Sequence, residues 1–125
     1  MGEERIRGLR PLRIPSGWEV RWNTFYDVDP EGLSEEELNE LSEDMLLLVH
    51  RRAGVVLDLG WYGGPGHYRL EAFRWFDDTE QMRQSLSQPL QELVSRSTDE
   101  IAQAIDAWLA RYSDIFYKVP PLRRK

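Results

Sequence analysis

Three strand-like segments separated by two turn signals constrain the fold of this chain most. Residues 45–49 form a continuous apolar run, which fits either a buried strand or the continuation of a preceding helix. We favour a strand, because residues 51–54 have the character of a turn into the β-branched run 55–59. Residues 61–66 then hold three glycines and a proline, and strand composition returns at 68–75. The pattern predicts an antiparallel meander of three central strands.

An alternating segment precedes this meander. Apolar and charged residues alternate from Trp18 to Trp22, which is the period of a half-buried strand. Trp18, Val20 and Trp22 should therefore face the core. Residues 29–32 include a proline and a glycine, which interrupt strands, so we expect this strand to end near residue 26 or 28.

Two helix starts are marked by capping residues. Ser34 is followed by acids at 35–37, with a glutamate at the third position as in a capping box. Residues 97–100 form a second start, and apolar residues then recur on one helical face. This apolar face consists of Ile101, Ala104, Ile105, Trp108 and Tyr112.

The region between the meander and the last helix is less regular. Residues 79–88 are polar and fit either a short helix or a loop, and residues 92–95 can pair as an edge strand. We therefore predict an α+β fold: an antiparallel meander sheet of four to five strands, an acidic helix after strand 1, and a C-terminal amphipathic helix packed on the sheet. We expect one domain over 14–117, with basic, flexible tails at 1–13 and 118–125.

Composition excludes several classes of protein and site. The 125 residues include no cysteine, which removes disulfides, thiolate nucleophiles and thiolate metal ligands. No apolar run approaches the roughly 20 residues that a membrane span needs, and the N-terminus lacks the apolar region of a secretory signal. We expect a cytoplasmic protein that does not bind membranes.

The negative charge is concentrated in one segment. The chain has 16 basic and 22 acidic residues, for a net charge of −6. No lysine or arginine lies between Arg21 and Arg51, whereas nine acids do, so the rest of the chain carries a net charge of +3. One interpretation is a solvated helix that keeps the protein soluble. The other is a surface that repels nucleic acid and attracts a basic protein.

Catalytic and cofactor signatures are weak. His50, His67 and Asp58 have the residue types of a two-histidine, one-carboxylate metal site, but turns flank both histidines, which suits ordinary surface positions. No serine lies in a nucleophile elbow, and the glycine-rich turn leads into a strand rather than a helix, unlike a phosphate loop. We predict no catalytic residue, no cofactor and no metal.

Several short strings resemble small bacterial immunity proteins of polymorphic toxin systems. These strings are residues 14–18, 23–30, 57–62 with 68–70, and 95–97, so the likeness spans about residues 14–109. The resemblance implies a cytoplasmic protein that binds and neutralises a cognate toxin domain without chemistry of its own. Because such families often inhibit nucleases with basic clefts, it also implies an acidic binding surface.

Three hypotheses follow. The first is an immunity-like binding protein that occludes a basic toxin, with Trp61 and Tyr62 as anchors beside six acids. The second is a small-ligand or carbohydrate-binding module that uses Trp61, Tyr62 and Trp75. The third is an enzyme of unfamiliar type, built on His67, Asp58 and Glu71. The six acids of the first hypothesis are Glu35, Glu36, Glu37, Glu40, Glu43 and Asp44.

Overall fold

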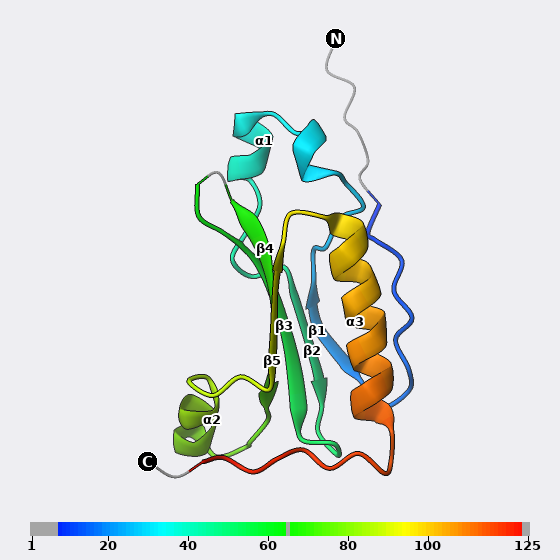
Figure 1. Ribbon diagram of the computed structural model, residues 1–125, viewed down its shortest axis with the longest axis vertical. Helices are drawn as coiled ribbons and strands as arrows, with labels where there is room; N and C mark the ends of the chain where they lie inside the picture. Colours follow the sequence, from blue (N-terminus) through cyan, green and yellow to red (C-terminus); the bar gives the residue numbers. More distant parts are fainter. Residues whose placement is uncertain (1–7, 65, 124–125) are drawn as a thin grey trace.

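The centre of the fold is a single antiparallel sheet whose strands follow one another in chain order (Figure 1). The structure is a computed structural model that describes residues 8–64 and 66–123. Every neighbouring pair of strands is antiparallel, so the predicted meander is confirmed, as is the strand interpretation of residues 45–49. The strands are β1 (Glu19–Asn23), β2 (Leu46–His50), β3 (Val55–Tyr62), β4 (His67–Arg74) and β5 (Gln91–Ser95).

Helices flank this sheet on both sides. The long helix α3 (Thr98–Ser113) lies along one face, whereas α1 (Glu35–Asn39) and α2 (Thr79–Ser85) lie toward opposite ends of the molecule (Figure 1). A short 3-10 turn, η1 (Pro30–Gly32), precedes α1. The predicted α+β class is thus confirmed, including the acidic helix after strand 1 and the C-terminal helix on the sheet. The polar stretch 79–88 begins as a helix and ends as a loop.

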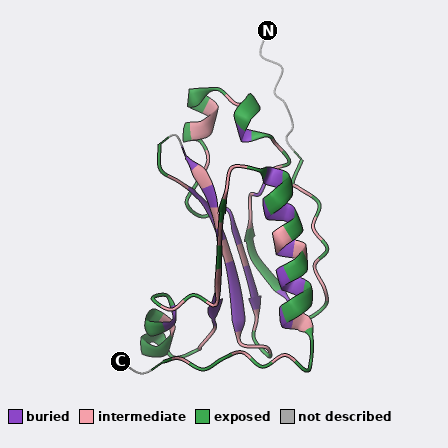
Figure 2. Ribbon diagram, viewed as in Figure 1, coloured by how far each residue is buried: buried purple, intermediate pink, exposed green. Residues whose placement is uncertain are grey.

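The main core lies between α3 and the sheet. Ile101, Ile105 and Leu109 are fully buried, because their spacing places them on the side of α3 that faces the strands (Figure 2). Trp108 and Tyr112 of the predicted apolar face are buried too, and Ala104 is half-buried. Each large side chain in this layer contributes roughly 1.5–3 kcal/mol by leaving water.

The opposite face of the sheet has a smaller core. Side chains alternate along a strand, so Leu57 packs with the main core while its neighbour Val56 points the other way. Val56 forms a small cluster with Val49 and Phe73, against which Met82 of α2 packs. We call this side the α2 face.

The prediction for the first strand is wrong in two respects. Trp18 is buried and donates its indole N–H to Ser113 Oγ at 2.7 Å, but Val20 and Trp22 are 48% and 53% exposed. A β-bulge at Arg21 breaks the alternation, and β1 is an edge strand with little packed over it. The strand also ends earlier than expected, because the chain leaves the sheet so that the Phe25 ring can pack in the core.

Parts of both expected tails lie against the domain. Leu9 forms an isolated bridge with Tyr26, and the Arg13 N–H donates to Asp106 of α3. Near the other end, Gln88 exchanges two hydrogen bonds with the Arg123 backbone. Residues 1–7 and 124–125 of these tails lie outside the described residues.

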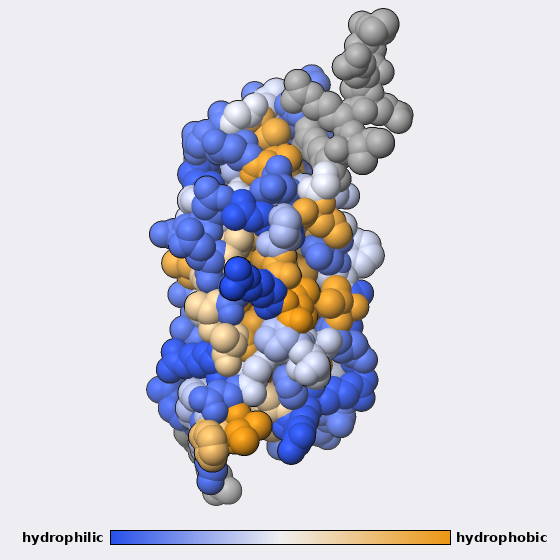
Figure 3. All heavy atoms as spheres, turned by 90° about the vertical axis from the view of Figure 1, so that its right-hand side faces the viewer, coloured by the Kyte–Doolittle hydropathy of each residue, from blue (hydrophilic) through white to orange (hydrophobic). Residues whose placement is uncertain are grey.

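The surface on the α3 side is mostly hydrophilic, with hydrophobic side chains showing along its middle (Figure 3). Among the described residues, no helix combines the length and the apolar character that crossing a bilayer requires.

Candidate functional site

The acidic helix α1 is short and held by local hydrogen bonds. Ser34 Oγ accepts from the Glu37 N–H at 3.2 Å, and Glu37 Oε1 accepts from the Ser34 N–H at 3.1 Å, which completes the predicted capping box. The acids of the first turn lie at the positive end of the helix dipole. The side chains of Glu35, Glu36 and Glu40 are exposed, whereas Glu37 is half-buried.

The segment after α1 is fixed to the sheet through its backbone. The backbone N–H of Trp61 donates to the Ser42 carbonyl at 2.9 Å, and the Tyr62 hydroxyl donates to the Glu43 carbonyl at 3.3 Å. The chain passes so close to β3 that a Cβ on Gly60 would overlap the Glu43 carbonyl oxygen. The Glu43 side chain nevertheless stays exposed. The fold therefore presents this acid from a rigid support.

A pocket of about 610 Å³ lies between α1 and the end of the β3–β4 hairpin. It brings together three members of the predicted set, Glu35, Glu43 and Trp61. Glu36, Glu37, Glu40, Asp44 and Tyr62 do not line it. The remaining lining residues are Leu38, Asn39, Leu41, Gly63, Gly64 and Arg96.

Trp61, predicted as an anchor, is almost completely buried. Its side chain is only 5% exposed and its ring packs edge-on against Tyr68, with 4.9 Å between ring centroids. It is the buried wall of the pocket rather than a surface platform. Tyr62 is half-buried, and the Arg69 guanidinium lies 5.3 Å from the centre of its ring.

Arg96 is the charged pocket residue that the sequence did not single out as a site residue. Its guanidinium lies 5.5 Å from the centre of the Trp61 ring, donates to Glu31 Oε1 at 2.7 Å, and also donates to the Gly66 carbonyl. The only signal in the sequence is a cation directly before the Ser97 helix cap. Its partners lie 30 and 65 residues away, so no local pattern reveals them.

The third aromatic of the ligand-binding hypothesis lies elsewhere. Trp75 follows the last residue of β4, which pairs with Val55, whereas Tyr62 pairs with His67 at the other end of the same hairpin. The Arg21 guanidinium stacks 4.7 Å from the Trp75 ring centre. Trp61, Tyr62 and Trp75 therefore do not form one aromatic platform.

The carboxylates of the enzyme hypothesis form a row on the α2 face. Asp58, Glu71 and Glu92 lie directly opposite one another on β3, β4 and β5. Burial, with a smaller contribution from the charge of Asp44, raises the pKa of Asp58 to about 6. Burial is also the largest cause of a raised pKa at Glu71. The hydrogen bond between Glu71 and Glu92 raises this pKa further. His67 lies four residues from Glu71 along β4, or about 13 Å, too far for the two to share a proton.

The two histidines lie too far apart for one metal ion. His50 pairs with Val55 and His67 pairs with Tyr62, seven residues along β3, so they lie about 23 Å apart. No cluster of three or more His, Asp or Glu side chains within residues 8–64 and 66–123 has the arrangement of a metal site.

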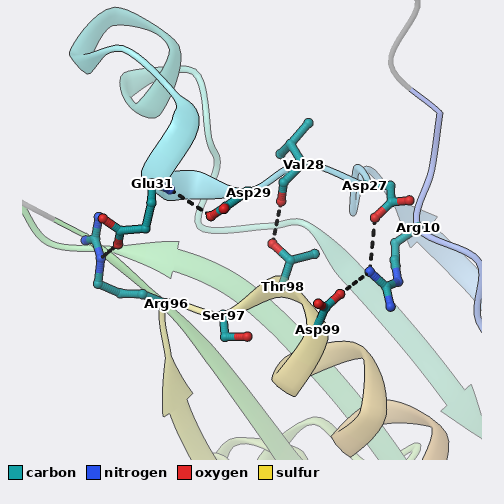
Figure 4. Close-up of a pocket in the computed structure, with 9 residues that line it drawn as sticks. All are labelled: Arg10, Asp27, Val28, Asp29, Glu31, Arg96, Ser97, Thr98 and Asp99. Carbon is teal, nitrogen blue, oxygen red and sulfur yellow. Dashed lines mark hydrogen bonds and ion pairs between the residues drawn. The ribbon is translucent and has the colours of Figure 1, made fainter.

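A second pocket, of about 420 Å³, lies at the start of α3 (Figure 4). Most of its charged side chains are already paired: Arg10 Nη1 lies 3.1 Å from Asp27 and 2.6 Å from Asp99, and Arg96 pairs with Glu31. Asp29 accepts the Glu31 backbone N–H. Thr98 donates its hydroxyl to the Val28 carbonyl. These contacts join the N-terminal segment, the loop after β1 and α3, so we interpret the pocket as a structural junction.

Comparisons of the chain with models of known protein families, with curated proteins and with solved structures find no match.

Proposed function

We propose that this chain is a non-enzymatic, cytoplasmic binding protein of the immunity type, which neutralises a basic toxin domain by covering its working surface. The proposal rests on the resemblance of residues 14–109 to such proteins and on the surface around α1. It requires no catalytic group in this chain, because occlusion alone stops the partner.

The exposed acids around α1 are the observation that carries the proposal. Glu35, Glu36 and Glu40 project from α1, and Glu43 and Asp44 project from the segment that follows. No lysine or arginine occurs from residue 22 to residue 50 to balance them. A concentrated charge of this kind accelerates association with an oppositely charged protein and repels nucleic acid. A nuclease with a basic substrate cleft is a partner of opposite, complementary charge.

The rigid backing of these acids supports the same conclusion. The capping box holds the first turn of α1, and the Trp61 and Tyr62 hydrogen bonds hold residues 42 and 43 on the sheet. A preorganised surface loses less conformational entropy on binding than a mobile one. Tyr62, half-buried beside Glu43, is the one predicted aromatic anchor with a partly exposed ring.

The test starts with the neighbouring genes, where the proposal expects a large reading frame that ends in a short toxin-like domain. That domain is then titrated calorimetrically with this protein at several salt concentrations. We expect tight binding that weakens as ionic strength rises. Changing all six acids, Glu35, Glu36, Glu37, Glu40, Glu43 and Asp44, to their amides should weaken binding at low salt by a factor of about 100 or more.

A matched pair of triple variants separates this surface from total charge. Glu35, Glu36 and Glu40 change to glutamine in the first variant, and Asp77, Glu80 and Glu100 change to their amides in the second. All six side chains are exposed, and both variants lose three negative charges. Equal affinity losses in the two variants would reject the α1 surface, and a domain that is neither bound nor inhibited would reject the function.

A further inference from the structure

The pocket between α1 and the β3–β4 hairpin combines apolar walls with unbalanced negative charge. Leu38 and Leu41 pack against the main core beside it, and the Trp61 indole forms a buried part of its lining. Glu35 and Glu43 line it as exposed side chains from two different segments. A long basic side chain has the same two-part character, an aliphatic stem and a charged head.

The charges within the pocket favour a cation over an anion. Arg96 is the basic residue of the lining, and its guanidinium is paired with Glu31. Neither Glu35 nor Glu43 forms an ion pair with any residue that the structure describes. The lining therefore carries two carboxylates that have no cationic partner among the residues placed in the structure.

Trp61 adds an unused hydrogen-bond donor. The side chain is 5% exposed, yet its indole N–H donates no hydrogen bond to the part of the chain that the structure describes. Gly66 packs closely against one side of the indole, because a Cβ at that position would overlap the ring. This nitrogen is not among the described buried side-chain atoms that lack a partner, so it is open to water and free to donate to an acceptor that a ligand brings.

The Trp61 indole already makes a cation–π contact with a guanidinium of this chain. Arg96 places its guanidinium 5.5 Å from the Trp61 ring centre while pairing with Glu31. A cation that enters from outside would meet the same combination of aromatic ring and carboxylate, supplied by Trp61 with Glu35 and Glu43.

We propose that this pocket receives a lysine or arginine side chain of the partner protein, with its stem against Leu38, Leu41 and Trp61 and its charged head between Glu35 and Glu43. A backbone carbonyl of the same partner residue accepts the Trp61 indole N–H. This inference rests on the proposed function, since it names the group by which a basic partner is held.

The test uses Nα-acetyl-arginine methylamide and Nα-acetyl-lysine methylamide as probes, followed by the amide and indole N–H resonances of the full chain. We expect saturable shifts of the Trp61 indole and of the Gly63 and Gly64 amides, with a dissociation constant of about 1 mM, as suits a ligand of this size. Nα-acetyl-norleucine methylamide, which has the stem without the charge, should bind at least tenfold more weakly.

A matched pair of double variants locates the binding. Glu35→Gln with Glu43→Gln should weaken probe binding at least tenfold. Glu36→Gln with Glu40→Gln removes the same charge from the same region outside the pocket lining and should weaken it less than threefold. Unchanged resonance dispersion confirms that both variants fold.

Two results would overturn the inference: shifts that cluster away from Trp61, or equal losses in the two double variants. Equal binding of the uncharged probe would also reject it. Because the probes need no toxin, the pocket can fail while toxin neutralisation stands, and probe binding can succeed while no toxin domain is recognised.

Discussion

Two acidic regions of the molecule carry the same charge in different surroundings. The α1 acids Glu35, Glu36 and Glu40 project into solvent from a short capped helix. Asp58 and Glu71 are half-buried on the α2 face of the sheet, each opposite another carboxylate. Exposed carboxylates keep their hydration and cost the fold little, whereas half-buried ones lose hydration and repel their neighbours. The first region therefore costs the free protein little stability, whereas the second lowers its stability.

The two regions meet where residues 43 and 44 cross β3. Asp44 lies near enough to Asp58 for its charge to raise the Asp58 pKa, and the Glu43 carbonyl lies over Gly60. Substitutions at this junction and on either side of it therefore test whether the two regions are independent.

The largest effect should come from Gly60→Ala. The added methyl group would overlap the Glu43 carbonyl and force the acidic segment away from β3. We expect the free energy of unfolding to fall by about 2 kcal/mol, measured by urea denaturation. Gly64→Ala is the control, because no atom lies within 4 Å of a Cβ there. A stable Gly60→Ala protein would mean that the segment is not tightly held.

Asp58→Asn should stabilise the protein near neutral pH. The Asp58 carboxyl has a pKa of about 6 when folded, against an ordinary value of 3.8, so the unfolded chain gives up its proton first as pH rises. Stability from this group is complete below about pH 3.8 and is lost as pH rises through about 6. Allowing for solvent screening, the variant should gain about 1 kcal/mol at pH 7.5 and little at pH 4. A gain of the same size at both values, measured by urea denaturation, would contradict the raised pKa.

Ser34→Ala should affect only the α1 region. The substitution removes the capping box and should destabilise α1 by about 0.5 kcal/mol, the low end of the range for exposed caps. Hydrogen exchange should accelerate for the amides of Leu38 and Glu40 and stay unchanged in β3 and β4. Faster exchange throughout the sheet would show that α1 and the sheet unfold together.

Glu36→Gln should have the smallest effect on stability. Its side chain is exposed, so we expect a change within about 0.5 kcal/mol at both pH 4 and pH 7.5. If the proposed basic partner binds at α1, the same variant should reduce the salt dependence of that binding. A pH-dependent gain like that of Asp58→Asn would remove the distinction between the two regions.

Sequence patterns were reliable where the structure depends on neighbouring residues. The turns around Gly54 and Gly63, the cap at Ser34 and the apolar face of α3 all depend on residues within a few positions of one another. The prediction failed at Val20 and Trp22, because a bulge and an edge position override the alternation of residue types. The candidate site was predicted in part: Glu35, Glu43 and Trp61 meet in one pocket, but Arg96 was missed.

The sequence alone determined the meander, the capped acidic helix, the amphipathic C-terminal helix and the confinement of net negative charge to one segment. These features follow from residue spacing and charge order, which are properties of the linear chain. The folded arrangement sets which acids share a pocket with Trp61 and which become half-buried beside another carboxylate. Strand register and burial bring distant residues together, and it is these contacts that set the environment of each charge.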